Sequence, residues 1–402
     1  MGEVLFLAHR APWPPDRGDR IRSWHVLRTL ASLAPVHVAA FADHEQDRAT
    51  ASPVLNRLCR TSHVEVRTAS RAGGALRMLP SLKPLSLGVF GSKTMAEHVD
   101  LILSTRPISH IFAFSCQMAQ FVPERFAGTF IMDFVDVDSA KFSAYAKDDS
   151  RLSPMRYVHA YEGWRMAAWE KTVAGRAALS LFVSEAEAAL FRSRSGYDES
   201  RVRALENGID LEHFRPGVVA APADGAGPLI VFTGQMDYRP NIEAVTNFTR
   251  DTLPLLLATH PAARFAIVGR APTPEVVALG EHPRVVVTGE VPDTRPWLAA
   301  ADVVVAPLTV ARGVQNKLLE AMAMGRPVVS SPAAAEGIDA QPGRDLFIAA
   351  TPRETADRII EIADNADIAT AMGTAARSRM EQRYGWDATL APLKAMISDG
   401  VS

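Results

Sequence analysis

Lys317 and Glu320 stand three residues apart in RGVQNKLLEAMAMG (residues 312–325), where a short polar stretch becomes an apolar one. If this segment is a helix, the two side chains share one face. The free N–H groups of its first turn would attract an anion, and Gly313 would let that anion approach closely. Lys317 would then neutralise a diphosphate, while Glu320 would accept hydrogen bonds from the paired hydroxyls of a ribose. The spacing therefore predicts a nucleotide site; the alternative is a buried helix with a Lys–Glu surface pair.

Three aspartates follow another apolar run, in MDFVDVDS (residues 132–139). One of Asp133, Asp136 and Asp138 is expected to orient a reacting hydroxyl group, with Asp136 or Asp138 favoured. The alternative is that these carboxylates cap the next helix and pair with Lys141 or with arginines, since aspartate is a common helix cap.

The loop PPDRGDRIR (residues 14–22) lies between the first apolar run and a helical pattern. Gly18 stands at the entrance of that helix, with Arg17, Arg20 and Arg22 nearby, so the loop could receive a donor phosphate or an anionic acceptor. The alternative is a proline-rich turn with solvated arginines. Gly18 is the residue of this loop that we expect in the site.

These candidates need strands that end beside them, and the apolar runs of the chain predict such strands. Short Val- and Ile-rich runs alternate with helical patterns, which is typical of parallel sheets with crossover helices. Segment 215–228 is rich in Pro, Gly and Ala and is a linker candidate. We expect an α/β protein of two doubly wound, Rossmann-like domains, residues 1–214 and 228–383, with residues 384–402 crossing back to the first. Ligands of such sheets bind beyond the carboxyl ends of the strands, which predicts a site in a cleft between the domains.

The composition is that of a globular protein. Of the 402 residues, 48% are hydrophobic and 22% charged, and no apolar run is long enough to cross a bilayer. Two cysteines make neither a metal cluster nor a disulfide framework, which favours a reducing, cytoplasmic location. The formal net charge of −2 gives no indication of nucleic-acid binding.

The segment LLEAMAMGRPVVSS (residues 318–331), followed by AAEGI, resembles the donor-site signature of the family 4 glycosyltransferases, which have the two-domain GT-B fold. Further matching segments cover most of residues 205–350: NGID, FTGQMDYRPN, FAIVGR, VTGEV and WLAAADVVVAPL. The combination of MDYRPN, ARGVQNK and MDFVDVDS is similar to sugar transferases associated with exosortase-type exopolysaccharide clusters in bacteria. The resemblance implies a nucleotide-diphosphate-sugar donor and a saccharide or lipid-linked acceptor.

The resemblance also implies which residues hold the donor phosphates. Backbone amides at Gly234 and Gln235, in the turn after the first strand of the second domain, are expected near the phosphate. Arg239 and Lys317 match its two basic ligands.

The remaining donor contacts involve the ribose, the base and the sugar. Glu320 matches the glutamate that holds the ribose, and Val291 falls where backbone groups meet the base. Typical members carry another glutamate eight residues before Glu320, where this chain has Arg312. Either Arg312 contacts the sugar or phosphate instead, for example the carboxylate of a uronic acid, or it is solvent-exposed and sugar recognition lies elsewhere.

The chemistry implied by the resemblance is retaining sugar transfer in which the leaving phosphate takes the acceptor's proton. We expect Arg239, Lys317, Asp136 and Asp138 to serve catalysis, without a cofactor or a metal. Two alternative functions are a non-catalytic sugar-nucleotide-binding regulator or scaffold, and an epimerase or phosphorylase of the same fold.

A membrane contact is a further expectation, because relatives often act on lipid-linked acceptors. Residues 71–95 mix Arg71, Arg77, Lys83 and Lys93 with apolar side chains and could lie on the inner membrane. The alternative is a helix and loop packed on the first domain.

Overall fold

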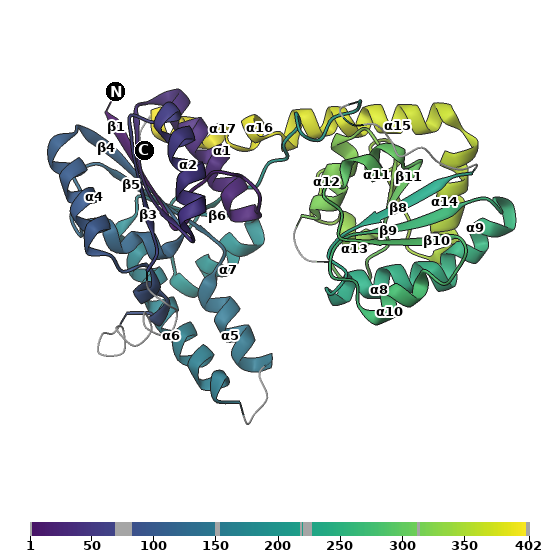
Figure 1. The fold of residues 1–402 in the computed structure, drawn as a ribbon, viewed down its shortest axis with the longest axis horizontal. Helices are drawn as coiled ribbons and strands as arrows, with labels where there is room; N and C mark the ends of the chain where they lie inside the picture. The colour runs from purple at the N-terminus through teal and green to yellow at the C-terminus, as the bar shows by residue number, and fades with distance from the viewer. Residues whose placement is uncertain are drawn as a thin grey trace. The chain divides into compact units, whose positions relative to one another are not determined.

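The computed structural model describes residues 2–68, 83–148, 153–217, 219, 227–311 and 314–398. The chain divides into two compact units, Met1–Asn207 with Thr389–Ser402, and Gly208–Ala388. Each unit is built on its own sheet, and each is described by itself (Figure 1).

The sheet of the first unit has seven strands in the order β3-β2-β1-β4-β5-β6-β7, all parallel. Residues 4–8 of the interior strand β1 are fully buried, as expected for a parallel strand that is covered on both faces. Because the order runs outward from β1 in both directions, right-handed crossovers place helices on both faces. The strands are β1 (Glu3–Ala8), β2 (Val36–Ala42), β3 (Thr61–Val66), β4 (Ile108–Phe114), β5 (Thr129–Val135), β6 (Leu179–Phe182) and β7 (Val202–Ala204).

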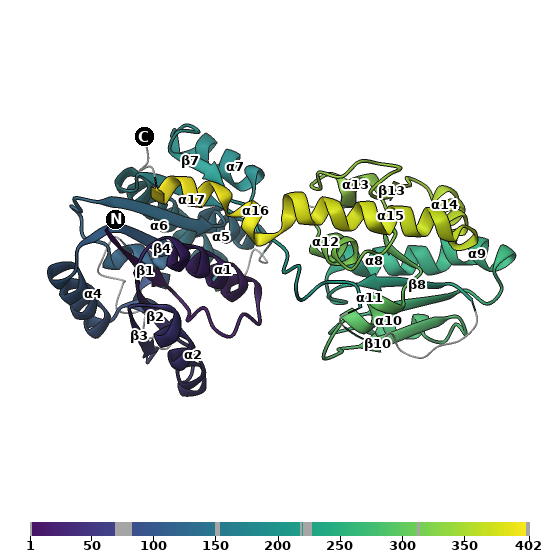
Figure 2. The same ribbon diagram turned by 90° about the horizontal axis from the view of Figure 1, so that it is seen from above.

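The helices of the first unit connect these strands, and α17, from the C-terminal end of the chain, packs against α1 (Figure 2). They are α1 (Gly18–Leu33), α2 (Glu45–Leu58), η1 (Leu85–Phe90), α4 (Lys93–Thr105), η2 (Cys116–Phe121), α5 (Asp138–Asp148), α6 (Pro154–Arg176), α7 (Glu185–Ser195) and α17 (Ala391–Ser398).

The segment considered for membrane contact is described only from Lys83 onward, and residues 71–82 lie outside the described residues. In the described part, Leu87, Phe90 and Met95 are buried. These apolar side chains therefore pack into the first unit, which favours the packed alternative for this part of the segment.

The second unit has six parallel strands in the order β10-β9-β8-β11-β12-β13. The predicted α/β class with two doubly wound parallel sheets is thus confirmed. The strands are β8 (Leu229–Thr233), β9 (Arg264–Val268), β10 (Val285–Gly289), β11 (Val303–Ala306), β12 (Val328–Ser330) and β13 (Phe347–Ile348). The helices are α8 (Arg239–Asn247), η3 (Phe248–Thr252), α9 (Leu253–Thr259), α10 (Pro274–Leu279), α11 (Arg295–Ala300), α12 (Asn316–Ala323), α13 (Pro332–Ala335), α14 (Pro352–Asp364), α15 (Ala366–Arg379), η4 (Met380–Tyr384) and α16 (Trp386–Thr389).

Residues 208–214 are held by the second unit. The N–H of Ile209 donates to the carbonyl of Tyr384 at 2.7 Å, and Arg377 donates to the carbonyl of Phe214 at 2.6 Å. Most of segment 215–228, the linker candidate, lies outside the described residues. Among the helices that are described, none combines the length and the apolar composition needed to cross a bilayer.

Candidate functional site

The turn after β8 and the first turn of α12 meet around one amino group. The Nζ atom of Lys317 donates to Oδ1 of Asn241 at 2.6 Å and lies 4.2 Å from the centroid of the Phe232 ring. A Cβ atom on Gly234 would come within 3.3 Å of this Nζ and within 2.8 Å of the Asn241 amide. The absence of a side chain at Gly234 therefore lets Lys317 lie directly over the turn.

Asn241 connects Lys317 to the backbone of this turn. It lies in the first turn of α8 with only 5% of its surface exposed, and its Nδ2 atom donates to the carbonyl of Gln235 at 2.9 Å. One buried amide thus fixes both the lysine and the Gly234–Gln235 turn. Asn241 is not among the residues predicted from the sequence, although a polar residue just inside a helix that follows a glycine turn is a usable signal.

A second close approach lies where β9 ends. The N–H of Gly234 donates to the carbonyl of Val268 at 3.0 Å, and a Cβ atom on Gly269, whose φ is +154°, would lie only 1.6 Å from the carbonyl oxygen of Gly234. Next to this glycine, Arg270 is exposed and donates to Oε1 of Gln235 at 3.0 Å. Arg270 is therefore a cation beside the turn that was not predicted from the sequence.

Burial shifts the pKa values of both charged residues of α12. Leu318, Leu319 and Met322 are buried as predicted, whereas Lys317 and Glu320 are half-buried. Desolvation lowers the pKa of Lys317 to about 8 and raises that of Glu320 to about 7, and each shift is opposed by the charge of the other residue. Within the described part of the chain, no group donates a hydrogen bond to the Glu320 carboxylate, so it is free to accept from a ligand.

Two further predicted donor residues, Arg239 and Val291, have partners other than Lys317. The Arg239 side chain is 88% exposed and pairs with Glu243 on its own helix at 2.8 Å. Val291 follows β10 and packs, half-buried, against the hydrophobic core of the second unit. Arg312 and Gly313 lie outside the described residues.

In the first unit, Asp133 is a structural residue of β5. It is fully buried and accepts two hydrogen bonds from Arg22 on α1, at 2.9 and 3.2 Å. Arg22 also donates to Oδ1 of Asn207 at 3.0 Å and is itself only 1% exposed. Arg22 therefore belongs to the interior, which differs from both sequence-based expectations, a phosphate ligand or a solvated arginine.

Asp138 lies at the start of α5 in a largely enclosed position. Its carboxylate is 3.5 Å from Nε2 of Gln117 and 3.7 Å from Sγ of Cys116, and burial raises its pKa. The amino end of α5 is occupied by other carboxylates, because Glu187 accepts from the N–H of Val137 at 2.7 Å and Glu170 from that of Ser139 at 2.9 Å. This helix end therefore has little capacity for an external anion.

Asp136 differs from its neighbours in having no side-chain hydrogen bond within the described residues. It is half-buried and follows Val135, whose φ of +71° is rare for a β-branched residue. Asp133 holds this conformation by accepting from the N–H of Val135 at 3.2 Å. Strained backbone next to an unengaged carboxylate at the end of a strand is typical of functional positions.

Gly18 is exposed at the start of α1, and a Cβ atom on it would meet nothing within 4 Å. The arginines around it have carboxylate partners. Arg20 is 1% exposed and donates to Asp47 at 2.9 Å, while Arg17 lies 3.4 Å from Asp43. The loop thus offers open space at Gly18 without unpaired arginines beside it.

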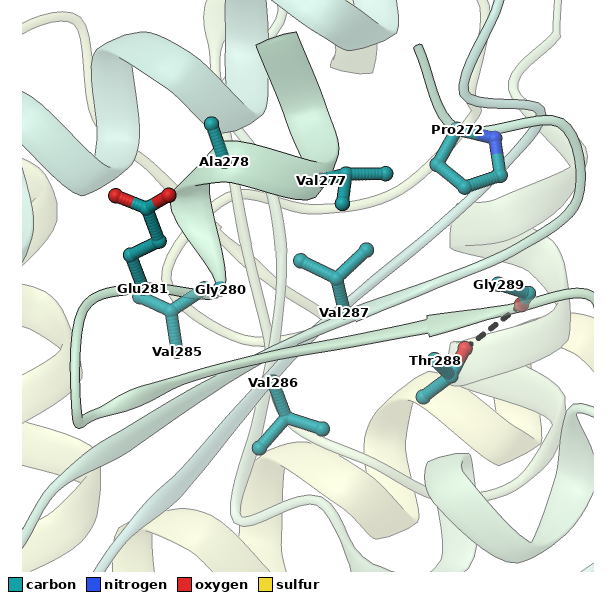
Figure 3. A pocket seen from close by; sticks show the side chains of 10 residues that line it. All are labelled: Pro272, Val277, Ala278, Gly280, Glu281, Val285, Val286, Val287, Thr288 and Gly289. Atoms are coloured by element: carbon teal, nitrogen blue, oxygen red, sulfur yellow. Dashed lines mark hydrogen bonds between the residues drawn. The ribbon is translucent and has the colours of Figure 1, made fainter. Parts of the chain in front are cut away.

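Figure 3 shows a pocket of about 620 Å³ between α10 and the edge strand β10. Val277 and Val287 point toward one another across it, and Glu281 carries the only charge among its ten lining residues, all of which are described. With no cation in its lining, this pocket does not suit a diphosphate. No three His, Cys, Asp or Glu side chains of the described chain gather in a way that could hold a metal ion.

Comparison with known proteins gives a family match within the second unit and solved structures of similar fold. Residues 227–365 match the family model described as glycosyl transferases group 1. No curated protein sequence matches the chain.

Solved structures of similar fold cover nearly the whole chain. HepE from Anabaena in complex with UDP has a TM-score of 0.62 at 16% identity, covering 99% of this chain and 100% of that one. Sucrose-phosphate synthase from Thermosynechococcus elongatus reaches 0.63 at 17% identity, and a glycosyltransferase from Rickettsia africae 0.64 at 13%, each covering 99% of both chains. The two parallel-sheet domains therefore have the GT-B fold.

Proposed function

We propose that this chain is a glycosyltransferase that transfers the sugar of a nucleoside diphosphate sugar to a hydroxyl group of an acceptor. The observation that carries this proposal is the amino group of Lys317, held by Asn241 over the Gly234 turn. The match of residues 227–365 to glycosyl transferases group 1 supports it. HepE, of similar fold, has been solved with UDP and with UDP-glucose.

The donor would bind to the second unit with its diphosphate beside Lys317 and its ribose beside Glu320. As the bond between the anomeric carbon and the phosphate oxygen breaks, negative charge grows on the leaving diphosphate and the sugar becomes oxocarbenium-like. Lys317 and the amides of the Gly234–Gln235 turn would stabilise that charge. Loss of one such preorganised donor commonly costs about 3 kcal/mol of transition-state stabilisation.

The acceptor oxygen forms the new bond to the anomeric carbon, and its proton passes to the leaving phosphate. Asp136, with its unengaged carboxylate, is the residue of the first unit that we assign to the reacting hydroxyl. We further propose a retaining, metal-independent reaction of the family 4 type, with a saccharide or lipid-linked acceptor in bacterial exopolysaccharide synthesis. These finer assignments rest on the motif resemblance.

The test is a panel of nucleotides and nucleotide sugars. Calorimetry with UDP, GDP, ADP and TDP should identify one preferred base, and the matching nucleotide sugar should release its diphosphate when acceptors are supplied. Activity that persists in EDTA would support the metal-independent route. Tight binding without turnover against any acceptor would instead support the regulatory alternative, and the absence of nucleotide binding would refute the proposal.

A further inference from the structure

The helices α5 and α6 carry an unusual concentration of exposed apolar side chains. Figure 1 shows them side by side, projecting from the sheet of the first unit. Of the eleven large hydrophobic residues that are exposed in the described chain, five belong to these two helices: Tyr145, Met155, Tyr157, Val158 and Trp164. Tyr157 is 71% and Trp164 65% exposed, values that packing within a soluble domain does not explain.

The aromatic residues of α6 form a continuous stripe. Tyr157, Tyr161 and Trp164 follow one another at intervals of four and three residues, so they share one face of the helix. The Tyr161 and Trp164 rings are in contact, with centroids 6.3 Å apart. Tyrosine and tryptophan, apolar with one polar end, are the residues that favour the boundary between lipid and water.

Among the described side chains of these two helices, all the exposed charges are positive, and Asp138 at the start of α5 is half-buried. Among residues 139–147 and 153–176, the only acidic side chains are Glu162 and Glu170, and both are buried. They accept backbone N–H groups, Glu162 from Leu85 and Ser86 and Glu170 from Ser139. The carboxylates of Glu162 and Glu170 are thus bonded in the interior of the unit, whereas the lysines at 141, 147 and 171 are exposed.

Further positively charged side chains line a groove beside the stripe. It has a volume of about 380 Å³, lies between α5, α6 and α7, and is lined by Lys147, Arg156 and Arg194 together with Trp164. These three cations form no ion pair with the described residues. Trp164 borders both the groove and the aromatic stripe, so the apolar and the cationic features form one surface.

We propose that this α5–α6 surface, defined by Tyr157 and Trp164 with Lys147, Arg156 and Arg194, docks the protein on an anionic lipid bilayer. The aromatic rings enter the headgroup region, and the cations bind lipid phosphates in and around the groove. A bilayer explains both features together, because an acidic soluble partner alone would not require exposed tyrosine and tryptophan on a projecting helix. The inference does not depend on the proposed sugar transfer.

Vesicle flotation of the full chain tests it. We expect binding to an equal mixture of phosphatidylglycerol and phosphatidylcholine, weak binding to phosphatidylcholine alone, and loss of binding as salt is raised. The double variants Tyr157→Ser/Trp164→Ser and Lys147→Glu/Arg156→Glu should each reduce binding about tenfold or more.

The controls lie outside this surface and outside segment 71–95. Leu101→Ser removes a 56% exposed apolar residue of α4, and Arg353→Glu reverses a 74% exposed charge of α14, so both should bind as the wild type does. Unchanged melting curves would show that the docking variants are folded. Equal binding to both kinds of vesicle, or wild-type binding by either double variant, would overturn the proposal. So would a sedimentation-detected dimer that Trp164→Ser dissociates, since a second copy would then cover the surface.

Discussion

The Nζ atom of Lys317 donates to Oδ1 of Asn241, whose Nδ2 atom donates in turn to the carbonyl of Gln235. These two hydrogen bonds fix the orientation of the amide, because a reversed amide would present N–H groups to a cation and oxygen to a carbonyl. Asn241 is therefore the residue that positions Lys317 over the turn after β8.

Replacing Asn241 tests this positioning role. Asn241→Leu removes the acceptor for Lys317 and leaves the Gln235 carbonyl without its donor, at a cost of about 1–3 kcal/mol in stability. We expect about tenfold weaker binding of a nucleoside diphosphate by calorimetry. Asn241→Asp keeps an acceptor for Lys317 and should raise the pKa of Lys317, but it also lacks the donor to Gln235 and adds a negative charge. Its affinity for the diphosphate should therefore be lower than that of the wild type at neutral pH and fall less steeply as pH rises through about 8. Equal affinity in wild type and Asn241→Leu would refute the role, and Arg353→Ala on α14, an exposed site, is the control.

The two perturbed groups of α12 give the stability of the free protein a specific pH dependence. The folded pKa of Glu320, about 7, exceeds its ordinary value of 4.5, so the folded state binds more protons in that window and the free energy of unfolding falls as pH rises through it. The folded pKa of Lys317, about 8, lies below 10.5, so the unfolded state binds more protons there and stability rises with pH.

Denaturation of wild type and Glu320→Gln across pH measures this dependence. Glu320→Gln should abolish the loss of stability between about pH 4.5 and pH 7. A fall of the same size in both proteins would mean that another group is responsible. In parallel, nucleotide affinity should decrease as pH rises through about 8, because Lys317 loses its charge.

Asp136 and Asp138 should respond differently to the same substitution. Asp136 has no side-chain partner within the described residues, so Asp136→Asn should lower turnover about 10²-fold or more while leaving the melting temperature unchanged. Asp138 contacts Gln117 and Cys116, so Asp138→Asn should alter stability more than turnover. Initial rates and melting curves of both variants decide this. Full activity of Asp136→Asn would remove Asp136 from the reaction.

The Arg22–Asp133 ion pair should contribute strongly to the stability of the first unit toward unfolding. Both side chains are buried, so Asp133→Ala leaves an uncompensated guanidinium in the interior, at a cost of about 3–5 kcal/mol. Arg22→Met/Asp133→Leu, which removes both charges, should recover much of that loss. Urea denaturation compares the variants; if the double variant were no more stable than Asp133→Ala, the ion-pair explanation would fail.

The sequence predicted the buried strands well because parallel strands covered on both faces are continuous apolar runs. VLFLA and TFIMDFV correspond to β1 and β5 within one residue at each end. By contrast, TSHVEV forms the edge strand β3 with every residue half-buried. Its alternating polar residues carry too little hydrophobicity to predict a strand without knowledge of its neighbour β2.

The site was predicted only in part, for a similar reason. Lys317 and Glu320 lie on one helix, so their common face follows from local spacing. The link from Lys317 to Asn241 joins residues 76 positions apart, and that from Arg22 to Asp133 joins residues 111 apart. Such pairings depend on the order of strands in the sheet, which a sequence pattern does not specify. The functional roles assigned to Lys317 and Glu320, like those assigned to Arg239, Val291, Arg312 and Gly313, stay predictions.

The central claim is that the amino end of α12, through Lys317, binds a diphosphate. Titration calorimetry of wild type and Lys317→Ala with UDP, UMP and uridine tests it most directly, supplemented by GDP, ADP and TDP if UDP does not bind. The account predicts that the wild type prefers the diphosphate over the nucleoside and that Lys317→Ala loses most of this preference while binding the nucleoside unchanged. Equal preference for the diphosphate in both proteins would contradict it.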